Sequence, residues 1–283
     1  TLSATNPPIV IDLQLADRPV LLTGSIRDGT RTGHLVGYRF GPAFRANPAA
    51  PFVGYYTLAF SGGTEPATSP FGHGFGTVRI KPNGRVLFQG TLADGSPLAQ
   101  IAPLALRGPW PIYAPLYKRR GLILGWITTN TDAGDLEGVL VWRKPGGSVG
   151  PFYPAGFTNV ITALGSRYST PPARARLLDF TNAVILLEGG NLSARATNEV
   201  ILQPRAQVIV APPNSNELAV AVDPKTGRFR GSFVNPQTHT RTVVRGAVLR
   251  KNNRGAGYFL GTDQSGAVYF GPPEDFPLLA PWP

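Results

Sequence analysis

Few side chains in this sequence have the spacing that enzyme or metal chemistry requires. The three histidines, His34, His73 and His239, lie in separate segments, and the chain contains no cysteine. A metal site needs two or three such ligands close together, usually with carboxylates. We therefore expect no histidine-held metal, no cofactor, no thiolate nucleophile and no disulfide.

The 16 acidic residues are numerous enough for a glycosidase pair, in which two carboxyl groups face each other across one bond. Asp132, Asp135 and Glu137 occupy one loop-to-strand segment, and Glu274 and Asp275 lie near the C-terminus. Asp135 and Glu137 would share one face of a strand. Asp132 and Asp135 also form a weak calcium candidate that lacks the final bidentate Glu. Acids beside Gly and Asn in a turn are more often turn-forming residues, so we favour a non-catalytic protein over a hydrolase with an acidic site.

Aromatic side chains give the strongest ligand-binding hypothesis. Four of them cluster in the sequence with two arginines, and the set is Trp110, Tyr113, Tyr117, Trp126, Arg119 and Arg120. If exposed, the rings would stack on sugar rings while the guanidinium groups bind acidic groups. The alternative is a buried barrel core, which we favour because Gly-rich barrels need large side chains to fill their interiors.

The formal net charge is +11 at pH 7, and arginine supplies most of it. The basic groups are spread over the whole chain, at residues 118–120, 174 and 176, 228 and 230, 241 and 245, and 250–254. Because the charge is dispersed, a solvated surface is favoured over an anionic partner such as an acidic polysaccharide. Nucleic acid is disfavoured further, since no helix-turn-helix, zinc finger or RNP pattern accompanies the charge.

The elements that must position these residues are β-strands. The chain has 34 Gly and 29 Pro, and only 15% of its residues are charged, which is typical of an all-β protein with almost no helix. Residues 77–92 and 219–233 are nearly the same hairpin, each with a charged residue followed by Pro and a turn closed by Gly. The sequence therefore predicts two related antiparallel β-barrel or β-sandwich units.

Turn-rich segments divide the chain into five parts. We expect an N-terminal strand and hairpin region at 1–47, packing on the first unit or on a neighbouring subunit. The first β-unit would span 48–145, a Gly/Pro linker 146–155, the second β-unit 156–271 and a Pro-rich tail 272–283. No apolar run reaches the ~18–20 residues that span a bilayer, so we expect no transmembrane segment.

Several motifs follow one another in a characteristic order. They are Gly76–Val78, Gly90–Gly95, Trp110–Tyr117, Leu124–Ile127, Tyr153–Phe157, Gly165–Tyr168, Gly231–Phe233 and Gly255–Gly261. Over most of residues 20–271 the chain thereby resembles a module of large secreted proteins from Verrucomicrobia and related bacteria. The resemblance implies a C-terminal, all-β part of a cell-surface or secreted protein with no assigned activity, so it supplies no catalytic residues.

These observations favour a secreted structural protein that assembles with itself or with other surface proteins. The chain begins with Thr rather than Met, which we take as the mark of an exported chain whose signal has been removed. Alternation places Ile9, Ile11, Leu13 and Leu15 on one face of a strand. We expect subunit contacts through this strand and through the apolar residues of the tail, Phe276, Leu278, Leu279 and Trp282. A glycan-binding module for acidic polysaccharide is the alternative.

Overall fold

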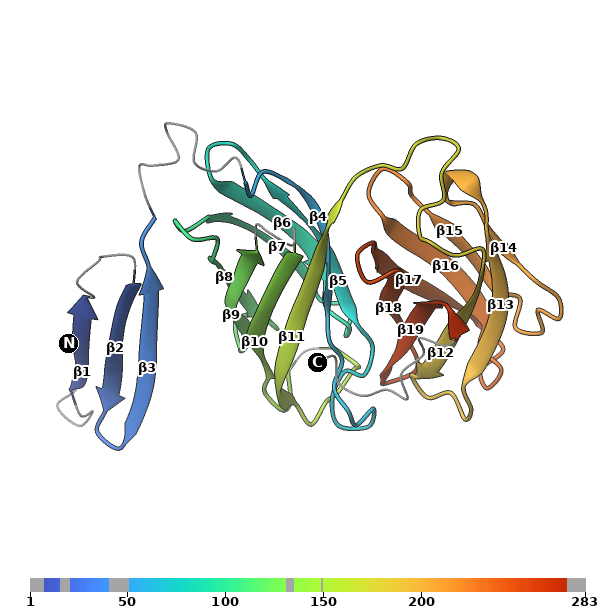
Figure 1. Cartoon of the computed structure of the whole chain (residues 1–283). Helices are drawn as coiled ribbons and strands as arrows, with labels where there is room; N and C mark the ends of the chain where they lie inside the picture. The colour runs from blue at the N-terminus through green and yellow to red at the C-terminus, as the bar shows by residue number, and fades with distance from the viewer. Residues whose placement is uncertain (1–7, 16–20, 41–50, 131–134, 149, 274–283) are drawn as a thin grey trace.

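The computed structural model describes residues 8–15, 21–40, 51–130, 135–148 and 150–273, and nearly all of its regular structure is antiparallel β-sheet (Figure 1). A small N-terminal sheet contains β1 (Ile9–Leu15), β2 (Leu21–Asp28) and β3 (Arg31–Tyr38). The first large sheet contains β4 (Gly54–Phe60), β5 (Gly74–Ile80), β6 (Arg85–Thr91), β7 (Pro97–Pro103), β8 (Trp110–Leu116), β9 (Gly121–Asn130), β10 (Asp135–Lys144) and β11 (Phe157–Tyr168). The second contains β12 (Asn182–Gly189), β13 (Ala196–Leu202), β14 (Val208–Val210), β15 (Ala219–Val222), β16 (Arg228–Val234), β17 (Arg241–Leu249), β18 (Arg254–Leu260) and β19 (Ser265–Gly271). Among the described residues, helical structure is limited to a 3-10 turn at Pro204–Ala206 and to Pro273 at the end of the described chain.

Each large sheet is a nearly closed barrel of eight strands. In barrel 1 each strand pairs with its sequence neighbour, except that β7 and β8 are not hydrogen-bonded, and the last strand, β11, pairs with the first, β4. Barrel 2 repeats this arrangement from β12 to β19, with its open position between β14 and β15. The expected two-unit, all-β fold is confirmed.

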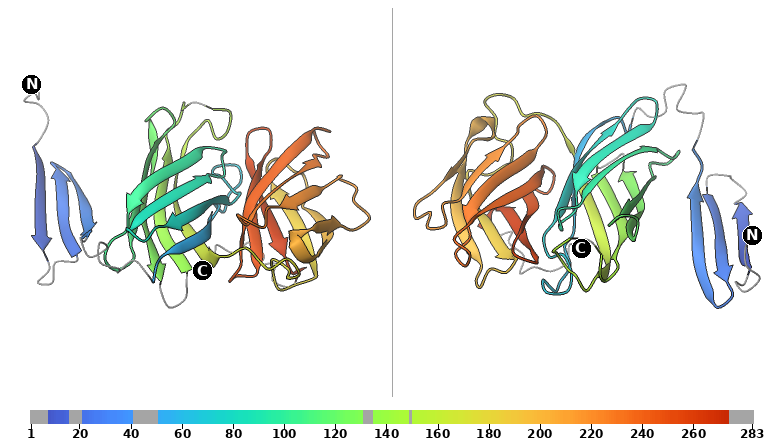
Figure 2. Two further views of the ribbon diagram at one scale, coloured as in Figure 1. Left: turned by 90° about the horizontal axis from the view of Figure 1, so that it is seen from above. Right: turned by 180° about the vertical axis from the view of Figure 1, so that it is seen from behind.

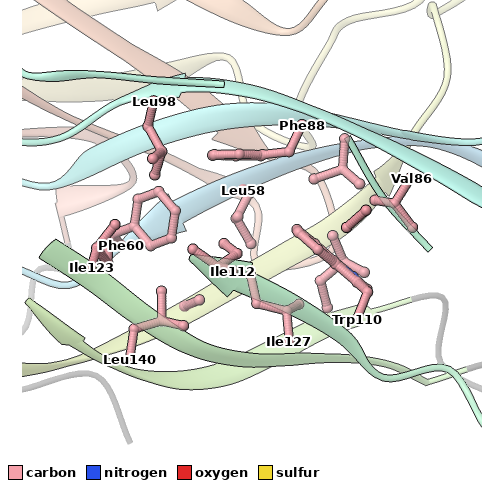
Figure 3. Packing of buried hydrophobic residues seen from close by; sticks show 14 of the residues in the cluster. Leu58, Phe60, Val86, Phe88, Leu98, Trp110, Ile112, Ile123, Ile127 and Leu140 are labelled. Carbon is pink, nitrogen blue, oxygen red and sulfur yellow. The ribbon is translucent and has the colours of Figure 1, made fainter. Parts of the chain in front are cut away.

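Side chains fill the interior of barrel 1. Strands place alternate residues inward, and these include two tryptophans and several phenylalanines, of which Trp110 has no exposed surface. Figure 3 shows the packing of Leu58, Phe60, Val86, Phe88, Leu98, Trp110, Ile112, Ile123, Ile127 and Leu140. Barrel 1 is therefore built around a packed core.

Side-chain amides bridge the open position of each barrel. In barrel 1, Gln100 on β7 donates from Nε2 to the Pro111 carbonyl (3.0 Å) and accepts from the Tyr113 amide (2.9 Å) on β8. In barrel 2, Asn198 on β13 exchanges two hydrogen bonds with Asn216, at 2.8 and 3.0 Å. Amides that both donate and accept can replace the missing ladder between two edge strands.

The outer walls of the two barrels pack directly against each other. Thr57 Oγ1 donates to the Val248 carbonyl (2.5 Å), and the His73 amide donates to the Gly257 carbonyl (2.9 Å). Small and apolar residues fill the contact, namely Ala59, Phe75, Ala93, Ala247, Leu249, Ala256 and Tyr258. The barrels thus form one packed body, as Figure 2 shows from two sides.

The predicted linker at 146–155 is not the boundary between the units. Strand β11 begins after it, and pairs with β10 and β4 in the first sheet. The segment belongs to the connection between β10 and β11 of barrel 1. Its Tyr153 hydroxyl accepts a hydrogen bond from the Ser265 amide of barrel 2 (2.8 Å). The chain instead crosses between barrels after Tyr168. This is the end of β11, the last strand of barrel 1, which pairs with β4.

The two similar hairpins form as predicted, but they occupy different places in the barrels. Residues 77–92 cover most of β5 and all of β6, the paired second and third strands of barrel 1. Residues 219–233 contain β15 and β16, the fourth and fifth of barrel 2. Gly84 and Gly227 close the turns at φ 75° and 69°. The shared sequence therefore reflects the same turn requirement rather than equivalent positions.

Candidate functional site

The N-terminal sheet has one apolar face and one face of mixed composition. Strand register places β1 residues 9, 11, 13 and 15 opposite β2 residues 28, 26, 24 and 22, which in turn face β3 residues 31, 33, 35 and 37. Apart from Asp28 and Arg31 at one end, every residue on this face is Ile, Leu or Gly. The other face is mixed: polar side chains and the Asp12–Arg27 ion pair (2.6 Å) lie beside Val10 and Val36, which are 45% and 47% exposed.

The apolar face is uncovered. The side chains of β1 that we expected to make subunit contacts, Ile9, Ile11, Leu13 and Leu15, are 66%, 53%, 56% and 74% exposed. No described part of the barrels packs over them. A sheet of this size with an open apolar face normally needs a partner surface for stability.

Glycines make this face flat. A Cβ added to Gly33 would lie 3.1 Å from Ile26, and one added to Gly37 would lie 3.4 Å from Leu22. The apolar side chains of β2 therefore lean over the glycines of β3, which leaves a smooth surface. Such a surface suits face-to-face packing on another sheet.

A second apolar face lies on the outside of barrel 1, across β8–β11. Register aligns Tyr113, Leu124, Val141 and Val160 in one row and Pro111, Trp126, Val139 and Thr162 in the next. In these two rows Tyr113, Leu124, Val139 and Val160 are 59%, 41%, 60% and 70% exposed. Outward-facing strand residues are usually polar, so four large exposed apolar side chains on one wall are unusual.

The N-terminal sheet stands beside this wall, with β3 as its nearest strand (Figure 1). The contact between them is small: the Tyr38 ring meets Trp126 edge-on at 4.6 Å, and the Leu106 amide donates to the Arg39 carbonyl (3.3 Å). Tyr38 lies on the mixed face of the sheet by register and covers only the Trp126 part of the wall. The apolar face of the sheet therefore remains open within one chain, and so does the part of the wall formed by Tyr113, Leu124, Val139 and Val160.

The six residues of the glycan hypothesis do not form one exposed platform. Trp110 lies in the core of barrel 1, whereas Tyr113 and Trp126 lie on its outer wall. Arg119 and Arg120 are exposed in the β8–β9 turn, where Arg120 Nη1 donates to a main-chain carbonyl at 2.8 Å.

Tyr117 belongs to a buried polar network at one end of barrel 1. Its hydroxyl donates to Asp94 Oδ2 (2.5 Å) and accepts from Trp142 Nε1 (3.0 Å), and the Lys144 ammonium lies 5.1 Å from its ring centre. Lys144 Nζ also donates to the Phe152 carbonyl. Burial raises the pKa of Tyr117 and lowers that of Lys144. These groups satisfy one another's hydrogen-bonding needs, so we interpret the network as structural packing at this end of the barrel.

The acidic and histidine candidates do not converge. Asp132, Glu274 and Asp275 lie outside the described residues. Asp135 pairs through Oδ2 with Lys251 of barrel 2, and Glu137 is exposed on β10. Within the described ranges no three His, Cys, Asp or Glu side chains are placed to hold a metal ion.

The C-terminal residues expected to mediate assembly, Phe276, Leu278, Leu279 and Trp282, also lie outside the described residues. In the described part of the chain no helix is long and apolar enough to cross a bilayer. The outer wall of barrel 1 was not anticipated as an assembly surface. Its signal was present in the apolar residues at both alternating positions of β9 and β10, although alternation alone does not say which set faces outward.

Comparison with known proteins gives little. Neither a protein family nor a curated protein matches the sequence. One solved structure that it resembles is a protein of unknown function in the DUF3598 family from Nostoc punctiforme, at 9% identity and a TM-score of 0.26. That match covers 79% of this chain and 96% of the other.

Proposed function

We propose that this protein is a non-catalytic structural subunit that polymerises outside the cell. In this proposal the apolar face of the N-terminal sheet docks on the β8–β11 wall of barrel 1 in the next copy. The observation that carries it is the presence on one chain of two separate apolar faces, each with four large exposed apolar side chains. Because each copy would use one face and leave the other open, contacts of this head-to-tail kind extend into filaments or close into rings.

Stable association of two copies requires the burial of both faces. Burying a whole Leu or Ile contributes about 1.5–3 kcal/mol, so each half-exposed side chain of β1 contributes about 1 kcal/mol on docking. The strand then supplies about 4 kcal/mol, and the barrel wall adds a similar amount. Association costs at least about 4 kcal/mol in lost freedom, so one buried charge in either face is enough to prevent it.

Charge favours a second copy as the partner. The described residues of the sheet carry two acids, Asp12 and Asp28, and two arginines, Arg27 and Arg31, and so have no net charge. The whole chain carries +11. Copies that meet through the sheet therefore meet where like-charge repulsion is weakest. The resemblance to secreted bacterial modules supports a location outside the cell.

The direct test is the mass of the native particle over a range of protein concentrations, measured by light scattering. We expect a concentration-dependent polymer for the natural sequence and a monomer for Leu13→Lys. Gln14→Lys is the matched control, because it adds the same charge to the neighbouring residue on the opposite face. A monomer at every concentration, or equal disruption by both substitutions, would overturn the proposal.

A further inference from the structure

A groove of about 620 Å³ lies between the barrels, beside β16 and β17. Barrel 1 contributes Phe75 and Thr91, and barrel 2 contributes Ala221, Val222, Asp223, Thr226, Arg228, Phe229, Arg230 and Arg245. A second hollow of about 370 Å³ shares Arg245 with it and continues toward Arg241. Residues that are far apart in the sequence thus line two neighbouring hollows that meet at Arg245.

Three arginines on this wall are close together without acidic partners. Arg228 and Arg230 project from the outer face of β16, and register places Arg230 directly opposite Arg245 on β17. Within the described chain none of the three forms an ion pair. Like charges directly opposite each other destabilise a sheet, so this pair favours a bound anion.

The acid in the groove forms no ion pair with them. Asp223 Oδ1 accepts from the Lys225 amide (2.9 Å), and its Oδ2 accepts from Thr226 Oγ1 (2.7 Å). These bonds lower the pKa of Asp223, with Thr226 as the main cause. The carboxylate therefore holds the β15–β16 turn and forms no ion pair with the arginines. Arg245 also hydrogen-bonds the Tyr258 side chain, so part of its guanidinium fork is in use, and the rest can face a ligand.

The rest of the lining distinguishes sugars from nucleic acid. The aromatic residues Phe75, Phe229 and Tyr258 are 4%, 3% and 3% exposed, so they offer no face on which bases could stack. Hydroxyl side chains are abundant instead, namely Thr91 and Thr226 in the groove and Thr238, Thr240, Thr242 and Thr262 in the adjoining hollow. Arginines with hydroxyl groups match the acidic and hydroxyl groups of a charged glycan.

We propose that the groove between the barrels binds a linear acidic polysaccharide, whose carboxylate or sulfate groups pair with Arg228, Arg230 and Arg245. Arginine is suited to this role because its guanidinium fork binds planar or tetrahedral oxyanions through two hydrogen bonds. The site shares no residue with the two apolar faces, so it stands whether or not the chain polymerises.

Binding is measured by calorimetry with alginate oligosaccharides, dextran sulfate, neutral dextran and a short single-stranded DNA. The groove variant is Arg230→Gln with Arg245→Gln. The matched control is Arg174→Gln with Arg176→Gln. These substitutions replace two exposed arginines and so remove the same amount of charge at a different place. All proteins carry Leu13→Lys, so that assembly cannot add avidity.

We expect one of the two acidic glycans to bind. Binding of alginate would indicate a preference for carboxylate groups, and binding of dextran sulfate a preference for sulfate groups. The groove variant should bind that glycan at least tenfold more weakly. The control pair should change affinity less than twofold, and neutral dextran should not bind. Thermal unfolding of the groove variant should occur at the same or a higher temperature, because a like-charge pair is removed. Equal weakening by both variants, binding of DNA alone, or no binding of either glycan would overturn the assignment.

Discussion

Burial of His73 between the barrels makes their stability depend on pH. His73 precedes β5, its amide donates to the Gly257 carbonyl of barrel 2, and its Nδ1 is buried. The pKa of this imidazole is lowered from 6.5 to about 4. Burial is the main cause, nearby Arg254 also lowers it, and a hydrogen bond to the Phe60 backbone opposes the shift. The folded protein therefore holds His73 neutral where an unfolded chain would protonate it.

The sign and size follow from proton linkage. As the pH falls through 6.5, His73 becomes protonated in the unfolded chain, whereas in the folded protein it stays neutral until about pH 4. Stability is thus fully present above pH 6.5 and is lost progressively between there and pH 4. At 1.36 kcal/mol per unit, the loss between pH 7 and pH 5 is about 2 kcal/mol.

The assay is urea unfolding of the natural sequence and of His73→Gln, which keeps a donor but does not titrate, at several values between pH 7 and pH 5. The difference in free energy of unfolding between the two proteins should narrow by about 2 kcal/mol over this range. His34→Gln and His239→Gln, which replace exposed residues, are the controls and should follow the natural sequence. Parallel curves for His73→Gln and the natural protein would refute the reasoning.

Three further predictions concern the core and the assembly surfaces. Trp110→Ala should lower the free energy of unfolding by about 3–5 kcal/mol, because it opens a cavity in barrel 1, while Tyr113→Ala on the exposed wall should change it by less than about 0.5 kcal/mol; chemical denaturation distinguishes the two. Added salt should shift light scattering toward polymer, because it screens repulsion between chains of charge +11, and dissociation by salt would contradict an apolar contact. Because the chain lacks cysteine, Leu13→Cys mixed with Val139→Cys should be joined on a gel by a flexible thiol-to-thiol cross-linker, whereas Gln14→Cys with Val139→Cys should be joined much less.

Local sequence was sufficient for turns and strands. The Pro and Gly residues at 82–84 and 224–227 predict tight turns, and both hairpins form there. Alternation of Ile and Leu from Ile9 to Leu15 predicts β1 and its apolar face. These features depend on neighbouring residues alone, which is why they could be read without the fold.

Pairing between strands and side chains that are distant in the sequence could not be predicted from the sequence. The Gly/Pro segment 146–155 has the composition of a linker, yet it lies between two paired strands, because a turn and a linker use the same residues. Gln100 and Asn198 bridge the open positions of the barrels, but a single polar residue in a strand does not reveal its partner. Arg230 and Arg245 meet only through the register of β16 and β17.

Mixing two variants that cannot assemble tests the proposed head-to-tail contact most directly. Leu13→Lys disables the sheet and leaves the barrel wall intact, whereas Val139→Lys disables the wall and leaves the sheet intact. Each alone should be monomeric, and an equimolar mixture should form a 1:1 dimer by sedimentation, since one functional pair of faces remains. A mixture that stays monomeric, or a dimer formed by Val139→Lys alone through two sheets, would contradict the account.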